Sequence, residues 1–125
     1  MSHQVDSDWR APSQYEVELV DRMLAEPFRG RNELVVQWAS ARVRIIDECG
    51  CLAIRPAAGS APCDTEYRVP VEAESPDENG SAHALLHVVD GFLNELEFYA
   101  DARPQVLDRV NLEHLELFAP PWRPS

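Results

Sequence analysis

The segment LLHVVDGFLNELEFY, residues 85–99, decides the fold of this chain. Apolar and polar residues alternate on both sides of Asp90-Gly91. An Asp-Gly pair in this setting predicts a β-hairpin, because both central positions of a type I′ turn need a positive φ. A two-residue loop places Val89 opposite Phe92, and the pairs farther from the turn follow by alternation: His87 with Asn94, Leu85 with Leu96, and His83 with Phe98. The same alternation predicts a core face made of Leu85, Phe92, Leu96 and Phe98.

Signals for an α-helix stand near the start of the chain. Ser13 and Glu16 have the S-x-x-E spacing of a capping box, in which both side chains satisfy free backbone N–H groups at a helix start. Apolar residues then recur every three or four positions, which is the period of an amphipathic helix. The sequence therefore predicts one helix that begins at Ser13 and ends near Pro27.

The rest of the regular structure is expected to be strands, because segments rich in β-branched and aromatic residues alternate with turn residues. The expected strands outside the hairpin are residues 35–38, 43–46, 51–55, 66–71 and 112–118. Residues 74–81 are expected to form a turn. One helix packed on about six mainly antiparallel strands gives a single α+β domain at residues 13–119, with a flexible lead at residues 1–12 and a tail at residues 120–125.

The composition excludes several classes of function. The chain has 22 acidic and 11 basic residues and a net charge of −11, so nucleic-acid phosphates would repel it. No apolar run approaches the roughly 20 residues of a membrane span, and the first residues lack the apolar stretch of a secretory signal. We therefore expect a cytoplasmic protein with no nucleic-acid partner and no membrane partner.

Histidine and cysteine residues invite a metal interpretation, but their spacing does not support it. On a strand, His83 and His87 start roughly 13 Å apart, which is too far for one zinc ion. Cys49, Cys51 and Cys63 lack the spacing of closed zinc sites, and Cys51 is expected as a small buried residue at the start of a strand. We expect no metal site and no cofactor.

Acidic residues are concentrated in one part of the chain. Residues 64–101 contain ten acids and one base, Arg68, which gives a net charge of −9. If the hairpin and the preceding loop lie together, they form a negative surface that attracts a basic protein and speeds its association. The alternative is a surface that serves only solubility. The candidate partner-binding residues are Glu72, Glu74, Asp77, Glu78, Glu95 and Glu97.

Two further functions stay open. Glu95 and Glu97 alternate onto one strand face about 7 Å apart, and paired carboxylates at such distances serve glycoside hydrolysis. With Tyr99 or His87 assisting, this pair predicts a small hydrolase or sugar-processing enzyme. An exposed apolar sheet face would instead indicate a homo-oligomeric structural domain.

Residues 85–99 resemble the signature L-L-H-V-x-x-G-x-L-x-E-L-E-x-Y of a small uncharacterised bacterial domain family. The leading helix and residues 28–34 look similar too, whereas Ala102-Arg103-Pro104 stands where family members often have a Gly. The resemblance implies a hairpin rather than a reaction, and some similar proteins look like immunity partners of contact-dependent inhibition toxins. Together with the acidic segment, it leads us to expect a non-enzymatic immunity protein that neutralises a basic toxin nuclease.

Overall fold

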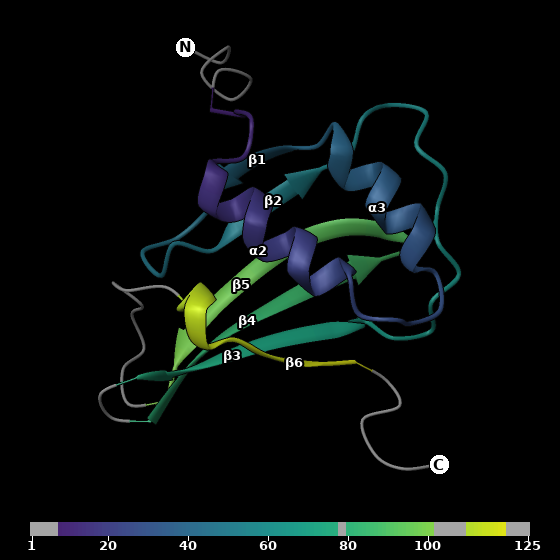
Figure 1. Ribbon diagram of the computed structural model, residues 1–125. Coiled ribbons are helices and arrows are strands. Elements are labelled where there is room, and N and C mark those ends of the chain that lie inside the picture. The colour runs from purple at the N-terminus through teal and green to yellow at the C-terminus, as the bar shows by residue number, and fades with distance from the viewer. Residues whose placement is uncertain (1–7, 78–79, 102–109, 120–125) are drawn as a thin grey trace.

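The computed structural model describes residues 8–77, 80–101 and 110–119. Two helices cover one face of a six-stranded antiparallel sheet (Figure 1). In chain order the elements are α2 (Gln14–Leu24), α3 (Arg31–Ala39), β1 (Arg42–Ile45), β2 (Leu52–Arg55), β3 (Val71–Asp77), β4 (Gly80–Val89), β5 (Phe92–Ala100), the 3₁₀ turn η1 (Leu112–His114) and β6 (Glu116–Phe118). The strand order across the sheet is β1-β2-β5-β4-β3-β6. The predicted α+β class is confirmed, with two helices in the described residues where the sequence predicts one.

The helix α2 begins at the predicted capping box. The Ser13 hydroxyl accepts a hydrogen bond from the Glu16 backbone N–H at 3.2 Å, and the Glu16 carboxylate accepts one from the Ser13 N–H at 2.8 Å. Glu16 is almost fully buried, and the Arg10 guanidinium donates to both of its oxygens, at 2.9 and 3.0 Å. The apolar residues that α2 buries in the core are Leu19, Val20, Met23 and Leu24.

Residues 35–38 belong to α3, so the strand prediction for them was wrong. Val35 and Val36 are 41% and 66% exposed, whereas Leu34, Gln37 and Trp38 are buried at the three- and four-residue spacing of a helix face. Burial of that face outweighs the strand propensity of two exposed valines, because strand propensity depends strongly on context.

The predicted strands at residues 43–46 and 51–55 are confirmed as β1 and β2, which form an antiparallel hairpin. The N-terminal segment adds one bridge to the outer edge of β1, since Arg10 and Val43 exchange backbone hydrogen bonds of 3.0 and 2.8 Å. Residues 112–118 are a single strand in the prediction but are divided between η1 and the short edge strand β6.

The boundaries of β3 differ from the prediction. Residues 66–70 are not in a strand, and β3 extends from Val71 through residues 74–77, which were expected to be part of a turn. Pro76 is compatible with this strand because it lies beyond Glu74, the last β3 residue that pairs with β6, so that side of the backbone needs no donor.

The hairpin predicted from Asp90-Gly91 is confirmed at its turn. Asp90 and Gly91 both have positive φ values, of 54° and 88°, and Val89 pairs with Phe92. Farther from the turn the predicted pairs of His87 with Asn94, Leu85 with Leu96 and His83 with Phe98 are wrong. The pairs in the structure are His87 with Glu95, Leu86 with Leu96, Leu85 with Glu97, Ala84 with Phe98 and His83 with Tyr99.

A β-bulge causes this difference. Asn94 has no partner on β4, and an extra residue in one strand exchanges the faces of every residue that follows it. Leu93 and Leu96, three residues apart, are therefore both buried, and Phe98 is buried with them as predicted. Leu85 and Phe92, which were expected in the core, lie on the opposite face of the sheet and are only partly buried.

Gln37 connects three segments at one end of the core. Its side chain is fully buried; Nε2 donates to the carbonyls of Ala61 and Gly91 at 2.8 and 2.9 Å, and Oε1 accepts from the Leu93 N–H at 2.8 Å. The Cys63 N–H also donates to the Gly91 carbonyl, at 2.8 Å. The helix α3, the loop before β3 and the hairpin turn are thus held by one polar network.

Cys51 is buried, as predicted, and its thiol contacts the backbone of Phe98. Sγ accepts from the Phe98 N–H at 3.2 Å, and burial raises the pKa of the thiol from 9.0 to about 11. The unfolded chain therefore loses this proton at a lower pH than the folded chain. The corresponding stability is complete below about pH 9 and is lost as the pH rises through about 11.

We expect the free energy of unfolding to fall by about 2 kcal/mol over that range because of Cys51. Urea unfolding at several pH values between about 8 and 11 measures the fall. In Cys51→Ala the fall should be smaller, since this variant has no thiol to ionise at that position. An equally large fall in the variant would contradict the assignment.

Candidate functional site

The face of the sheet turned away from α2 and α3 carries the candidate site (Figure 1), and we name it the open face. Alternation along the strands places the apolar core residues on the helix side and the polar residues on the open face. The register of the strands arranges these polar residues in rows across the sheet. One row across β5, β4, β3 and β6 is Tyr99, His83, Glu74 and Glu116, and the next is Glu97, Leu85, Glu72 and Phe118.

Four of the six predicted contact residues lie on this face: Glu72 and Glu74 on β3, and Glu95 and Glu97 on β5. The side chain of Asp77 and the whole of Glu78 lie outside the described residues. Asp101 and Glu116, which the sequence did not single out as contacts, join the four. We name the acidic face as Glu72, Glu74, Glu95, Glu97, Asp101 and Glu116.

Two histidines lie among these carboxylates. His83 Nε2 is 2.7 Å from Asp101 Oδ1, and His87 Nε2 is 2.8 Å from Glu97 Oε1. The Nδ1 atom of each ring is buried and makes no hydrogen bond, although His83 Nδ1 lies 3.4 Å from Glu72 Oε2. The imidazoles therefore hold some of the carboxylates in fixed orientations on the sheet.

Tyr99 stacks against His83, its cross-strand partner. The ring centroids are 4.4 Å apart and the planes differ by 10°. Burial raises the pKa of the Tyr99 phenol, and the nearby carboxylates Glu72, Asp101 and Glu97 raise it further. The phenol therefore stays neutral at physiological pH and offers an uncharged, partly buried surface within the acidic face.

The other end of the open face is basic. Arg44 on β1 and Arg55 on β2 place their Cζ atoms 4.7 and 4.4 Å from the centre of the Trp9 ring. Arg42 is the register partner of Arg55. Cation–π contacts restrain the two guanidinium groups over the indole. The open face is therefore bipolar, with arginines on β1 and β2 and carboxylates on β3, β5 and β6.

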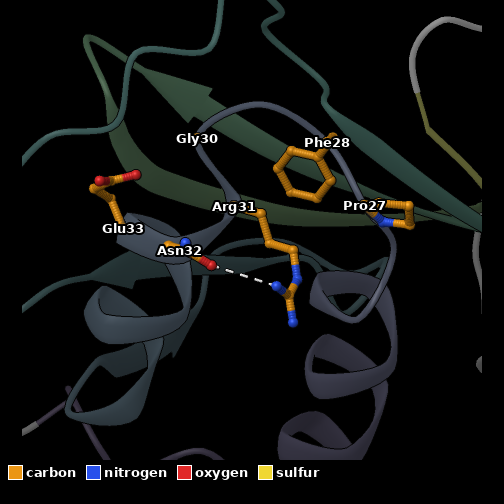
Figure 2. A pocket seen from close by; sticks show the side chains of 6 residues that line it. All are labelled: Pro27, Phe28, Gly30, Arg31, Asn32 and Glu33. Atoms are coloured by element: carbon orange, nitrogen blue, oxygen red, sulfur yellow. Dashed lines mark hydrogen bonds between the residues drawn. The ribbon is translucent and has the colours of Figure 1, made fainter.

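Two surface hollows lie away from the acidic face. A hollow of about 280 Å³ lies where α2 ends and α3 begins (Figure 2), lined by Pro27, Phe28, Gly30, Arg31, Asn32 and Glu33. Arg31 donates a hydrogen bond to the Leu24 carbonyl, so its positive charge already stabilises the C-terminal end of α2. A second hollow, of about 460 Å³, lies between residues 63–68 and residues 88–91.

The predicted enzymatic pair, Glu95 and Glu97, does share one face of β5. The Glu97 carboxylate forms a hydrogen bond of 2.8 Å with His87 Nε2 of the neighbouring strand. Neither of the two hollows is lined by Glu95 or Glu97. The pair thus belongs to the acidic face rather than to either of these hollows.

The alternation of the sequence could have identified the two additional acids. Asp101 continues the spacing of Glu97 and Tyr99, and Glu116 lies in a segment of alternating charged and apolar residues. The basic end was harder to predict, because it brings together Trp9, Arg44 and Arg55 from three separate segments.

Comparison of the chain with protein-family models, with curated proteins and with solved structures finds no match. Within residues 8–77, 80–101 and 110–119, no helix combines the length and the apolar content that crossing a membrane requires.

Proposed function

We propose that this chain is a non-enzymatic binding protein that docks a basic protein domain on its acidic face. The observation that carries the proposal is the gathering of Glu72, Glu74, Glu95 and Glu97 on one side of a sheet whose other side is occupied by the helices. A sheet holds such side chains in a fixed array, and a fixed array of like charge raises the association rate of an oppositely charged partner.

The surface also offers contacts other than charge. Leu85 and Tyr99 are partly buried between the carboxylates, and Phe118 is 41% exposed at the edge. Apolar and aromatic side chains surrounded by polar groups are typical of protein–protein interfaces. A nuclease that must attract phosphate carries a positive active site, so an immunity protein that occludes a toxin nuclease in the cytoplasm fits this surface.

Salt dependence and charge removal test the proposal. The probe is a purified basic nuclease domain, and its association with the chain is followed by surface plasmon resonance at several salt concentrations. In a variant with Glu72→Gln, Glu74→Gln, Glu95→Gln and Glu97→Gln, we expect the association rate at low salt to fall about 10- to 100-fold and its salt dependence to flatten.

The matched control removes the same charge from other exposed positions, through Glu18→Gln, Asp21→Asn, Glu33→Gln and Glu113→Gln. This variant should associate within about twofold of the wild type, because the charges it loses lie outside the acidic face. Equal effects in the two variants, or no effect in either, would contradict docking on the acidic face.

A second candidate rests on the bipolar character of the open face. A two-fold axis would place the Arg42, Arg44 and Arg55 end of one copy against the carboxylates of another, as in a self-complementary dimer. Light scattering of the chain alone distinguishes the candidates: a dimer that dissociates with salt and in the four-glutamine variant supports self-association, and a monomer supports the heterologous partner.

A further inference from the structure

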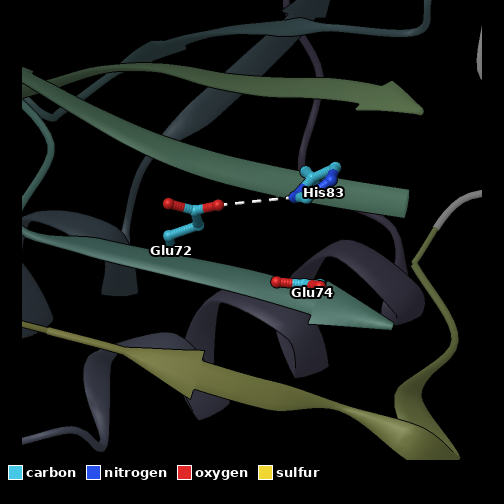
Figure 3. A group of neighbouring side chains, drawn as sticks. All are labelled: Glu72, Glu74 and His83. Atoms are coloured by element: carbon cyan, nitrogen blue, oxygen red, sulfur yellow. Dashed lines mark ion pairs between the residues drawn. The ribbon is translucent and has the colours of Figure 1, made fainter. Parts of the chain in front are cut away.

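Three side chains that can ligate a metal converge on the open face. Glu74 and His83 are directly opposed across β3 and β4, and Glu72 lies two residues before Glu74 on the same face of β3. One ligating atom from each of the three lies within 4.8 Å of the others (Figure 3). The sequence spacing pairs His83 with His87 along one strand, whereas the register joins His83 to residues of the neighbouring strand β3.

The hydrogen bonding of His83 prepares one nitrogen for a ligand. His83 is 9% exposed, and its Nε2 is 2.7 Å from Asp101 Oδ1. An ionised carboxylate only accepts, so Nε2 carries the donated proton and a neutral ring has its lone pair on Nδ1. A carboxylate that orients a histidine through its far nitrogen is the usual outer partner of a metal-ligating histidine.

The atoms around His83 Nδ1 favour a positive charge at this position. Nδ1 is buried, makes no hydrogen bond, and lies 3.4 Å from Glu72 Oε2. With the proton on Nε2, this contact brings two acceptors together, which is unfavourable in a buried setting. A cation bound between Nδ1 and the carboxylates would turn this repulsion into ligation.

We propose that Glu72, Glu74 and His83 bind one divalent transition-metal ion of the zinc class, with Asp101 as a positioning residue. Imidazole nitrogen and carboxylate oxygen suit zinc, whereas magnesium and calcium prefer oxygen ligands alone. Tetrahedral zinc with bonds near 2.1 Å needs donor atoms about 3.4 Å apart, so donor atoms that lie within 4.8 Å of one another must approach by at most about 1.4 Å. His83 Nδ1 and Glu72 Oε2 already have this separation, so the movement falls mainly to Glu74, which is partly exposed.

Three protein ligands leave one position of a tetrahedral ion open to water or to a side chain of another molecule. The ion would also remove part of the negative charge at the centre of the acidic face. The metal proposal does not depend on the proposed partner, because it concerns the free chain, and either proposal can fail without the other.

Calorimetry on the full chain tests the site. The chain is first freed of metal with a chelator and then titrated with zinc chloride, and separately with magnesium and calcium chloride. We expect saturable binding of one zinc ion per chain, at least tenfold weaker in Glu72→Gln and in Glu74→Gln. Asp101→Asn should weaken zinc binding about 10- to 100-fold, as loss of an outer partner does. Magnesium and calcium should bind at least tenfold more weakly than zinc.

Glu95→Gln is the matched control, since it removes the same charge from the same face without touching the three ligands. It should bind zinc within about twofold of the wild type. Thermal unfolding of each variant without metal verifies folding, and zinc should raise the melting temperature of the wild type and of Glu95→Gln by more than that of Glu72→Gln or Glu74→Gln.

Nitrogen-15 spectra of the wild-type imidazoles give a measurement that needs no variant. Zinc should shift the His83 Nδ1 resonance and leave that of His87 Nδ1 unchanged. The proposal is overturned by any of three results: no saturable zinc binding, equal weakening in Glu95→Gln and Glu72→Gln, or a His83 Nδ1 that keeps a proton in the presence of zinc. A proton on His83 Nδ1 in the presence of zinc would show instead that His83 is an imidazolium paired with the carboxylates.

Discussion

Replacing Gln37 by Met should lower the free energy of unfolding by about 2–4 kcal/mol. Methionine keeps the length of the side chain but makes none of the three hydrogen bonds of Gln37. The Leu93 N–H is then left in a buried position without its acceptor, and an unsatisfied buried donor costs about 1–3 kcal/mol by itself. The loss of two donated bonds to the carbonyls of Ala61 and Gly91 adds to this.

Denaturant unfolding measures the loss, and hydrogen exchange locates it. The Leu93 amide should exchange faster in Gln37→Met by more than global destabilisation explains. Val36→Met, at an exposed position of the same helix, is the control and should lie within about 0.5 kcal/mol of the wild type. A Gln37→Met protein as stable as this control would show that the network does not hold the three segments together.

Replacing Gly91 by Ala should cost about 3 kcal/mol and lower the melting temperature by about 10 °C. Two effects add. The φ of 88° costs a non-glycine residue about 1–2 kcal/mol, and a Cβ atom at this position would lie 2.7 Å from both the Cys63 carbonyl oxygen and Pro62 Cβ. Since the first of these contacts is with backbone, the loop at residues 62–63 or the turn itself must move.

Gly59→Ala separates the two effects. Gly59 has the same φ of 88°, but no heavy atom lies within 4 Å of the position that its Cβ would take. It should therefore cost about 1 kcal/mol, through backbone strain alone. Differential scanning calorimetry of the two variants gives the comparison, and equal melting temperatures would refute the argument that the turn is packed too tightly for a side chain.

The elements that the sequence predicts correctly are those that depend on local chemistry. The capping box of Ser13 and Glu16 is complete within four residues, and the Asp90-Gly91 turn needs only two positive φ values. Both signals depend on a few adjacent residues and on no tertiary contact. The strands β1 and β2 were similarly predictable, because a turn separates two short segments rich in β-branched residues.

The elements that were predicted wrongly from the sequence depend on which side chains the fold buries. In α3, the spacing of Leu34 and Trp38 was a helical signal, but Val35 and Val36 between them favoured a strand. In β5, Leu93 and Leu96 cannot face the same side of a regular strand, and their spacing was a sign of the bulge. Such signals become decisive only when it is known which side chains the helices cover.

The candidate site was predictable in composition but not in arrangement. Charge density along the chain pointed to Glu72, Glu74, Glu95 and Glu97, and alternation within each strand was sufficient to place each pair on one face. The convergence of Glu74 with His83 depends on the register between β3 and β4, in which Glu74 pairs with His83 and Asp77 with Gly80. No sequence signal fixes that register.

The bulge at Asn94 also bears on how this strand can change over evolution. Asn94 has no partner on β4, whereas Leu93 and Glu95 on either side of it pair with the adjacent residues Val88 and His87. Loss of the codon for Asn94 would therefore leave Leu93, Glu95 and Leu96 in regular alternation, with their partners on β4 unchanged. Descendants of this chain can thus lose this one residue without exchanging the two faces of the strand.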